Sequence, residues 1–529
     1  MKRLLLACAL VAGCTGGESG GGASCNETRE QRFEDLATMI EAERVELDAP
    51  GVSVALLEDG VVVWAEGFGS RLADDDACAR ASTLYRIGSC NKMLTSAALL
   101  RRVESGAVAL DDAVTDHSPN FHFAENAAWA PSIQVKHLMT HSSGMYDYLA
   151  IEGPTDDAEL EGFLTGTGPN DFGSIMFLMA PAGRFWNYSN PNFYVAALVN
   201  QDATAGDVFY RDILREEVLL PLGMDRTVFL AGDVLDDGDY ATGASYDWTD
   251  GTGTAIAAPD SYDNAWARPA GYAWSSVEDM ARFAQFLFDG NTAVLSDALR
   301  TEMQSPQVST DYFLDYSHYG YGLSVDEGFQ LGSEWYDTRM VSHNGAIPGF
   351  SAAMYTIPST RFAFITLANT DGAYFPDSLM MALRDFAGLP APVAVPDPQV
   401  VPADFPDFAG TYEDPYNAGT VVIGTSGNGL FISMPDLDAL NIPYESALVP
   451  YSKNNFILGI QGFELLATFI LDSAGNGEFF RTRSFVAERA PSAFAPAPPP
   501  ALSRESLERA LRDARHAPPL PGNIGSDAR

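Results

Sequence analysis

The stretch Tyr85-Arg86-Ile87-Gly88-Ser89-Cys90-Asn91-Lys92-Met93-Leu94-Thr95 places a serine and a lysine three residues apart at the start of a predicted helix. Ser89 and Lys92 would share one face of that helix. A serine hydroxyl is a weak nucleophile until a base removes its proton, and an amine held in partly dry surroundings can be that base. A lone Ser-x-x-Lys is more often a helix start with a chance lysine. The rest of the chain must decide between the two interpretations.

Apolar spacing and turn residues on both sides of this stretch predict alternating helices and strands. The helices are expected at residues 30–46, 89–104, 276–289 and 377–386. The strands are expected at residues 51–57, 61–64, 351–355 and 361–367. Glu58-Asp59-Gly60 is a good hairpin turn between the first two strands. Between about Leu110 and Trp266 the pattern indicates helices and long loops rich in Gly, Asp and Pro.

Length and composition describe a large globular protein. The chain has 529 residues, of which 46% are hydrophobic, so it can hold a large core and more than one domain. The formal net charge is −40 at pH 7. A nucleic acid would be repelled by such a surface, so we expect no nucleic-acid partner.

The N-terminus is typical of an export signal. Lys2 and Arg3 precede an apolar run, residues 4–12, that is too short to span a bilayer as a helix. Val11-Ala12-Gly13-Cys14 resembles a bacterial lipobox, which predicts a signal peptide at 1–13 and a lipid on Cys14. The alternative is an ordinary signal peptide with a fortuitous cysteine. Either predicts export. With the lipid, the location would be the cell envelope, at the periplasmic face of the outer membrane or in the periplasm.

The mature chain then begins with a Gly/Ser-rich tether at 14–28. Export permits disulfides, and Cys25, Cys78 and Cys90 remain after signal removal and lipidation. The simplest arithmetic is one disulfide and one free thiol. Cys25 with Cys78 is the candidate pair, because Cys90 adjoins Ser89 at a buried helix start.

The C-terminal part has a different composition. A Pro-rich linker is expected at 390–402, followed by a small β-barrel or sandwich domain at 403–489. Its strand candidates are residues 420–423, 430–433, 455–458, 467–471 and 478–481. The Pro/Ala-rich tail at 490–529 is expected to be largely disordered, with one helix candidate at 503–516.

Three later stretches add to the Ser-x-x-Lys. They are 135–145, with His137 and His141; Tyr188-Ser189-Asn190; and His343-Asn344-Gly345. In this order, the set resembles the serine β-lactamase and penicillin-binding-protein superfamily. The branch in question holds class C β-lactamases, D-alanyl-D-alanine carboxypeptidases, D-aminopeptidases and esterases. The resemblance extends to Pro50-Gly51-Val52, Pro221-Leu222-Gly223 and Pro269-Ala270-Gly271, and covers about Glu30 to Phe386.

This resemblance implies a fold. Residues 29–389 would form an α/β sandwich in which helices flank an antiparallel sheet, with a helical insertion as the other wall of the cleft. The small C-terminal antiparallel β domain resembles lipocalin-like modules appended to some relatives. It would be either a stabilising accessory or a domain whose loop reaches the cleft and limits substrate size.

The resemblance also implies site roles. Ser89 would be the acylated nucleophile, Lys92 its proton partner, and Tyr188 the group that passes the proton to the leaving group. Asn190, His343 and Gly345 would bind substrate. The backbone N–H groups of Ser89 and Ala346 would form the oxyanion hole. Whether Lys92 or Tyr188 is the general base stays open, because coupled groups titrate as a unit. No cofactor and no metal are expected.

His343 departs from the lysine of class C β-lactamases, whose permanent charge meets the substrate carboxylate. A histidine is only partly charged at pH 7. This favours an exported serine peptidase, of the D,D-carboxypeptidase or D-aminopeptidase type, or an esterase. A β-lactamase with weak activity is the alternative. The partner would be a small-molecule or peptide substrate, peptidoglycan-derived ones included; the protein would be a monomer and meet a membrane only through its N-terminal lipid.

Other interpretations have weaker support. His137 and His141 are four residues apart, as zinc ligands can be, but Leu138 replaces the glutamate of His-Glu-x-x-His. Asn91 replaces the second glycine of a Gly-x-Ser-x-Gly elbow. A non-catalytic penicillin or peptidoglycan-fragment sensor with the same pocket is the competing hypothesis of a different class.

Overall fold

The computed structural model describes residues 29–121, 123, 127–148, 153–167, 172, 176–206, 208–246, 254–490 and 523–524. The predicted signal peptide, Cys14, the tether and the tail helix at 503–516 lie outside these residues. Across the described ranges, no helix combines the length and the apolar character needed to cross a membrane.

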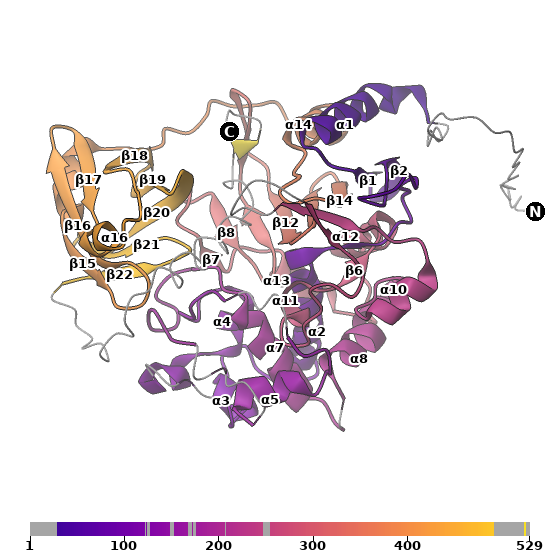
Figure 1. Ribbon diagram of the computed structural model, residues 1–529, viewed down its shortest axis with the longest axis horizontal. Helices are drawn as coiled ribbons and strands as arrows, with labels where there is room; N and C mark the ends of the chain where they lie inside the picture. Colours follow the sequence, from indigo (N-terminus) through magenta and orange to yellow (C-terminus); the bar gives the residue numbers. More distant parts are fainter. Residues whose placement is uncertain are drawn as a thin grey trace, which may run out of the picture.

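The main domain is built on an eight-stranded antiparallel sheet (Figure 1). The strands, in spatial order, are β2 (Val61–Gly69), β1 (Gly51–Glu58), β14 (Phe362–Ala368), β13 (Phe350–Ile357), β12 (Met340–Ile347), β9 (Ser324–Asp326), β8 (Ser317–Tyr319) and β7 (Val308–Ser309). The predicted hairpin is confirmed, and Asp59 and Gly60 take the positive φ values of 51° and 77° that a tight turn requires. Since β1 pairs with both β2 and β14, the N-terminal hairpin joins the strands that follow His343.

Both faces of the sheet are buried along β1. Val52, Val54 and Leu56 of β1 pack with α1 (Glu34–Glu46) and α14 (Pro376–Phe386). Ala55 and Leu57 point the other way, into the core that holds α2 (Asn91–Glu104) and α12 (Val277–Asp289). Side chains alternate along a strand, so one strand serves two cores. This confirms the predicted α/β sandwich.

The region between α2 and α12 is mostly helical and packs around α2, whose residues from Asn91 to Leu100 are all buried. Its helices are α3 (Val114–His117), α4 (Val135–Met139), α5 (Glu159–Thr165), α7 (Pro191–Asp202), α8 (Tyr210–Leu214), α9 (Leu220–Leu222), α10 (Ala231–Asp237) and α11 (Arg268–Gly271). After α12 comes α13 (Asp297–Met303). Short 3₁₀ helices are η1 (Gln31–Phe33), η2 (Gly88–Cys90), η3 (Ala127–Ser132) and η5 (Pro402–Asp404), and η4 (Arg215–Leu219) is a π-helix.

Small sheets complete the main domain. They pair β3 (Tyr85–Arg86) with β6 (Trp274–Ser275), β4 (Gly243–Tyr246) with β5 (Thr254–Ala257), and β10 (Phe329–Leu331) with β11 (Glu334–Tyr336) and β23 (Asn523–Ile524). The β3–β6 pair stands directly before Ser89, so it fixes where the Ser-x-x-Lys turn begins.

The C-terminal β domain is a closed antiparallel barrel. Its strands are β15 (Gly410–Asp414), β16 (Gly419–Ser426), β17 (Gly429–Ser433), β18 (Ala447–Ser452), β19 (Asn455–Ile460), β20 (Phe463–Leu471), β21 (Gly477–Arg481) and β22 (Val486–Arg489), with the short helices α15 (Phe405–Phe408) and α16 (Pro435–Ala439). β22 pairs with β15 and closes the barrel, which leaves no open edge. Sequence reasoning missed β15, β18 and β22, because two are short and partly polar and β18 contains Pro450.

The barrel packs against the main domain beside β7 and β8 (Figure 1). Ile470, Phe479 and Val486 belong to the main hydrophobic core, and the Phe479 ring lies 5.3 Å from that of Phe185. Polar contacts surround this patch, among them the ion pair between Arg184 and Glu478. The two domains therefore share a continuous interface.

Candidate active site

The Ser89 turn lies close against β12, and two glycines make this close contact possible. Gly88 has a φ of +48°, and a Cβ there would lie 2.6 Å from the Ala346 nitrogen. A Cβ at Gly345 would lie 2.0 Å from the Ile87 carbonyl oxygen and 3.0 Å from the Ser89 nitrogen. Only glycine allows backbones to approach this closely. The predicted oxyanion-hole residues, Ser89 and Ala346, are thereby brought to the same place.

Lys92 is fully buried beside Ser89. Its Nζ lies 2.9 Å from Ser89 Oγ, 2.7 Å from Asn190 Oδ1 and 2.8 Å from the Ala270 carbonyl oxygen. Burial holds the pKa of Lys92 well below its usual value, with the Asp147 carboxylate opposing the shift. A neutral amine has two N–H bonds and one lone pair. It can donate to Asn190 and Ala270 while it accepts the Ser89 hydroxyl proton.

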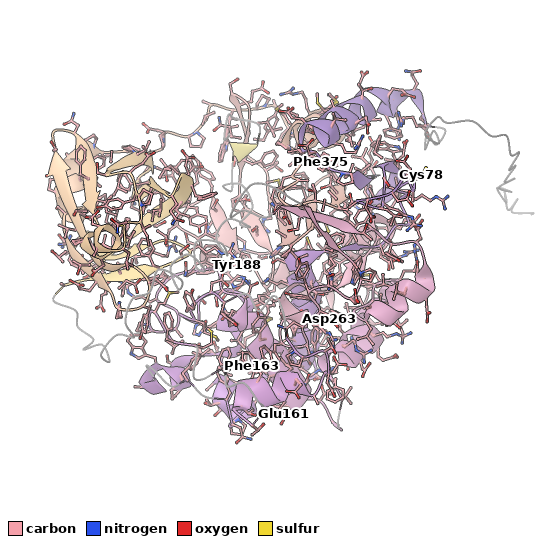
Figure 2. All side chains as sticks on the ribbon, viewed as in Figure 1. Cys78, Glu161, Phe163, Tyr188, Asp263 and Phe375 are labelled. Carbon is pink, nitrogen blue, oxygen red and sulfur yellow. The ribbon has the colours of Figure 1, made fainter. Side chains whose placement is uncertain are left out.

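Tyr188 lies near the centre of the molecule (Figure 2), where it forms a hydrogen bond with Ser89. The Lys92 Nζ lies 5.0 Å from the Tyr188 ring centroid. Burial raises the pKa of Tyr188 above its usual value of 10, while the Arg483 cation and a hydrogen bond with Ser89 oppose that rise. The tyrosine is therefore a neutral phenol in the resting site.

Asn190 is oriented by a residue that sequence reasoning missed. Asp147 Oδ1 accepts from the Asn190 backbone N–H at 2.8 Å and from its side-chain Nδ2 at 2.9 Å. With Nδ2 occupied by the carboxylate, Asn190 Oδ1 faces Lys92. The other Asp147 oxygen accepts from Arg483 Nε at 2.9 Å. Asp147 thus links the barrel to the residues around Ser89.

His343 is buried and neutral. Its Nδ1 lies 2.6 Å from the Asn344 carbonyl oxygen, which only accepts, so Nδ1 carries the proton. Nε2 then accepts from the Tyr319 hydroxyl at 2.9 Å. Burial, aided by the nearby Lys92, lowers the pKa of His343 to about 3. The sequence led us to expect a histidine that is partly charged at pH 7. In the structure His343 is uncharged at that pH, because burial disfavours the charged ring.

His141 packs against the catalytic tyrosine candidate. Its ring centroid lies 4.1 Å from that of Tyr188, and its Nδ1 accepts from the Ser189 backbone N–H at 3.1 Å. Burial keeps the pKa of His141 well below its usual value. Helix α4 ends at Met139, so His141 does not share a helical face with His137, whose Nδ1 instead accepts from the Gln134 N–H. The zinc hypothesis needed both histidines on one helical face, and the structure does not place them there.

The two cysteines in the described residues, Cys78 and Cys90, have structural surroundings. Cys90 is buried, its Sγ donates to the His343 carbonyl oxygen at 3.3 Å, and burial raises its pKa to about 12. It is therefore not a reagent. Cys78 is disulfide-bonded, but its predicted partner Cys25 lies outside the described residues, so that pairing stays a prediction.

The predicted residues converge on one place. The side chains of Ser89, Lys92, Tyr188, Asn190 and His343 surround each other, and Gly345 and Ala346 lie behind the Ser89 turn. Asp147, Tyr319 and Arg483 are the additions. Asp147 stands two residues beyond the quoted stretch 135–145, so its place could have been suspected. No sequence signal singles out Arg483, which is 336 residues from its partner Asp147.

Comparisons with known proteins find relatives that cover most of the main domain. The family model described as Beta-lactamase matches residues 36–387. Protein flp of Staphylococcus aureus (strain MW2) is 24% identical over 357 residues, 66% of this chain and 65% of the relative. Penicillin-binding protein 4* of Bacillus subtilis (strain 168) is 24% identical over 336 residues, 60% of this chain and 68% of the relative. This chain thus spans just under two thirds of the length of the Staphylococcus relative.

Solved structures share the fold. The octameric penicillin-binding protein homologue from Pyrococcus abyssi aligns with 86% of this chain and 99% of its own, at a TM-score of 0.58 and 21% identity. SurE aligns with 87% of this chain and 99% of its own, at a TM-score of 0.63 and 18% identity. D-amino acid amidase from Ochrobactrum anthropi SV3 aligns with 66% of this chain and 98% of its own, at a TM-score of 0.53 and 22% identity. The first two likenesses extend beyond the family-matched residues.

Proposed function

Since the chain belongs to the beta-lactamase family, whose model covers residues 36–387, we propose that it is a serine hydrolase that forms an acyl-enzyme on Ser89. The observation that carries the proposal is the buried Lys92 amine, 2.9 Å from Ser89 Oγ, with its pKa well below the usual value. A lowered pKa increases the unprotonated fraction of the amine at a given pH, and the unprotonated amine is the form that can act as a base.

In the proposed acylation, the Ser89 oxygen attacks the substrate carbonyl carbon and its proton passes to Lys92. The bond to the leaving group breaks as Tyr188 gives its phenol proton to the departing nitrogen or oxygen and regains one from Lys92. The backbone N–H groups of Ser89 and Ala346 hold the oxyanion, an interaction typically worth about 3 kcal/mol per donor. Water then attacks the ester carbonyl by the same proton route in reverse.

We assign the resting base to Lys92 and the relay to Tyr188. The opposite pKa shifts support this division: burial favours the neutral form of both groups, which makes the amine a base and leaves the phenol an acid. His343 would then act as a neutral, oriented wall of the site, and Asn190 as the amide that meets substrate and Lys92.

For the substrate, we propose a D-amino peptide or amide, or a short ester, ahead of a β-lactam. His343 is neutral and its Nε2 is occupied by Tyr319, so β12 presents no fixed cation for a β-lactam carboxylate. The fold shared with a D-amino acid amidase supports the same class. A weak β-lactamase and a non-catalytic sensor are the competing functions. The lipobox at Cys14 supports an exported, lipid-anchored protein.

Labelling tests the proposal. We expect a fluorescent penicillin or a p-nitrophenyl ester to acylate Ser89, detected by mass spectrometry of the labelled peptide, and Ser89→Ala to abolish labelling. Ser105→Ala, at the exposed end of the same helix, is the matched control and should label normally. Labelling that survives Ser89→Ala would overturn the assignment.

Turnover separates the competing functions. A panel of p-nitrophenyl esters, D-amino acid amides, D-Ala-D-Ala peptides and nitrocefin should give repeated product release with the ester or D-amino substrates. Fast nitrocefin hydrolysis would favour the β-lactamase. A stable label without any release would favour the sensor.

A further inference from the structure

The turn between β21 and β22 of the barrel, residues 482–485, reaches into the candidate active site. It carries Arg483, whose guanidinium carbon lies 4.6 Å from the Tyr188 ring centroid. Its Nη2 lies 2.8 Å from Asp147 Oδ2, and the two side chains are only 16% and 3% exposed. A cation is therefore placed over the reacting tyrosine by a domain outside the family-matched residues.

A continuous chain of polar contacts joins this arginine to the nucleophile. Arg483 donates to Asp147, and Asp147 accepts from Asn190 at 2.8 and 2.9 Å. Asn190 accepts from Lys92 at 2.7 Å, and Lys92 lies 2.9 Å from Ser89 Oγ. Each member orients the next, so a displaced Arg483 would loosen the amide that holds Lys92.

The turn is tightly held. Thr482 Oγ1 accepts from the backbone N–H groups of Ser484 and Phe485 at 3.2 and 3.1 Å. Asn417 Nδ2 donates to the Ser484 carbonyl oxygen at 3.2 Å. At its base, the buried Arg481 donates to the carbonyl oxygens of Trp186 and Thr310 in the main domain. The turn thus holds Arg483 at a defined position.

Contacts other than those of Arg483 also join the two domains. The ion pair between Arg184 and Glu478, the Arg481 contacts and the shared apolar core already join the barrel to the main domain. Arg483 differs from these groups because it faces the reacting side chains.

We propose that the barrel completes the active site, with Arg483 as a positioning residue for Tyr188 and, through Asp147 and Asn190, for Lys92. This inference rests on the proposed acylation of Ser89. It assigns the appended domain a part in the chemistry.

Charge gives the proposal a distinctive signature. The titratable and charged groups that act on Lys92 or Tyr188 are Asp147, Arg483, Cys90, His141, His343, Tyr319 and Tyr374. The cysteine, the two histidines and the two tyrosines are neutral near pH 7, because their pKa values are shifted away from it. The charges that remain are those of Asp147 and Arg483. Arg483 lowers the pKa of both Lys92 and Tyr188, and Asp147 raises both.

Removing the two partners should therefore move the pH profile in opposite directions. Arg483→Gln raises the pKa of Lys92, so the acid limb of the acylation rate shifts to higher pH. Asp147→Asn shifts it to lower pH. The measurement is the stopped-flow rate of Ser89 acylation by a p-nitrophenyl ester between pH 5 and 9. We expect Arg483→Gln to slow acylation at pH 7 by on the order of ten- to a hundredfold, and Arg483→Lys to recover part of the loss.

The matched control is Arg184→Gln, which breaks an ion pair of the same interface without touching Tyr188. It should keep the wild-type profile, and thermal melts show that each variant is folded. The proposal is overturned if Arg483→Gln keeps the wild-type pH profile. It is also overturned if Arg483→Gln and Arg184→Gln lose the same fraction of the acylation rate and neither shifts the profile. If wild type itself is never acylated, the proposed function fails as well, and the Ser89 labelling experiment reveals that case separately.

Discussion

At the scale of single residues, burial decides which side chains carry charge. Lysine and histidine side chains can both carry a positive charge, but burial lowers the pKa of Lys92 and of His343. The pKa of His343 falls to about 3. The shift has an energetic consequence, because a buried neutral histidine binds its proton less readily than the same residue in the unfolded chain. Burial therefore favours the uncharged form of both side chains, whereas exposed residues of the same types would be wholly or partly protonated at pH 7.

His343 should make the protein less stable in mild acid. Its folded pKa lies below its unfolded value of about 6.5, so the unfolded state binds more protons between pH 6.5 and 3. Stability contributed by the neutral ring is complete above pH 6.5 and falls with pH, by up to about 1.4 kcal/mol per unit. We expect urea denaturation to show a smaller loss between pH 7 and 5 in His343→Gln than in wild type. An equal loss would contradict this.

At the scale of elements, the contact between the Ser89 turn and β12 requires glycine on both sides. Gly88 and Gly345 let the strand and the turn approach until a Cβ on either would clash with backbone. Helix α2 then continues from the turn and carries Lys92 one turn beyond Ser89. The geometry of the candidate active site is thus set by how closely two elements pack.

Gly88→Ala should damage the site more than the fold. The positive φ costs an alanine about 1–2 kcal/mol, and the new Cβ would lie 2.6 Å from the Ala346 nitrogen. Gly106→Ala is the matched control, since its φ is +73° and nothing lies within 4 Å of a Cβ there. Gly88→Ala should lose more stability than Gly106→Ala in a thermal melt, because it adds the backbone clash to the strained φ. Only Gly88→Ala should lose Ser89 acylation in the folded protein, by on the order of a hundredfold or more. Equal acylation in the two would contradict the role of the close contact.

At the scale of the whole molecule, the barrel is part of one folded unit. Its residues Ile470, Phe479 and Val486 lie in the main hydrophobic core, and Arg481 donates to carbonyl oxygens of the main domain. Deleting the barrel would expose this apolar surface to water, at roughly 25 cal/mol per Å². A truncated chain is therefore a poor probe of what the barrel does.

We expect the barrel and the main domain to unfold together. Differential scanning calorimetry of the full chain should give one transition, because the shared core couples the two domains. Arg481→Met, which removes the buried contacts with Trp186 and Thr310, should lower the midpoint and weaken this coupling. Two separate transitions in the wild-type chain would show that the barrel is an independent accessory.

Much of the fold could be predicted from local patterns. The hairpin of β1 and β2, the helices α1, α12 and α14, and the strands β13 and β14 lie close to where apolar spacing and turn residues place them. Ser276 caps α12 with a bond from the Asp279 N–H, as a helix start requires. Three barrel strands escaped prediction because closure of the barrel, rather than their own composition, makes them strands.

The sequence by itself determined the pair Ser89 and Lys92, because a helical turn sets the spacing of residues three apart. Its motifs also indicated Tyr188, Asn190 and His343 as partners. Only the tertiary structure decided their protonation, since a pKa depends on burial and on charges that other elements supply. It alone placed Arg483 over Tyr188, because no local pattern encodes a contact between residues that meet only when two domains pack.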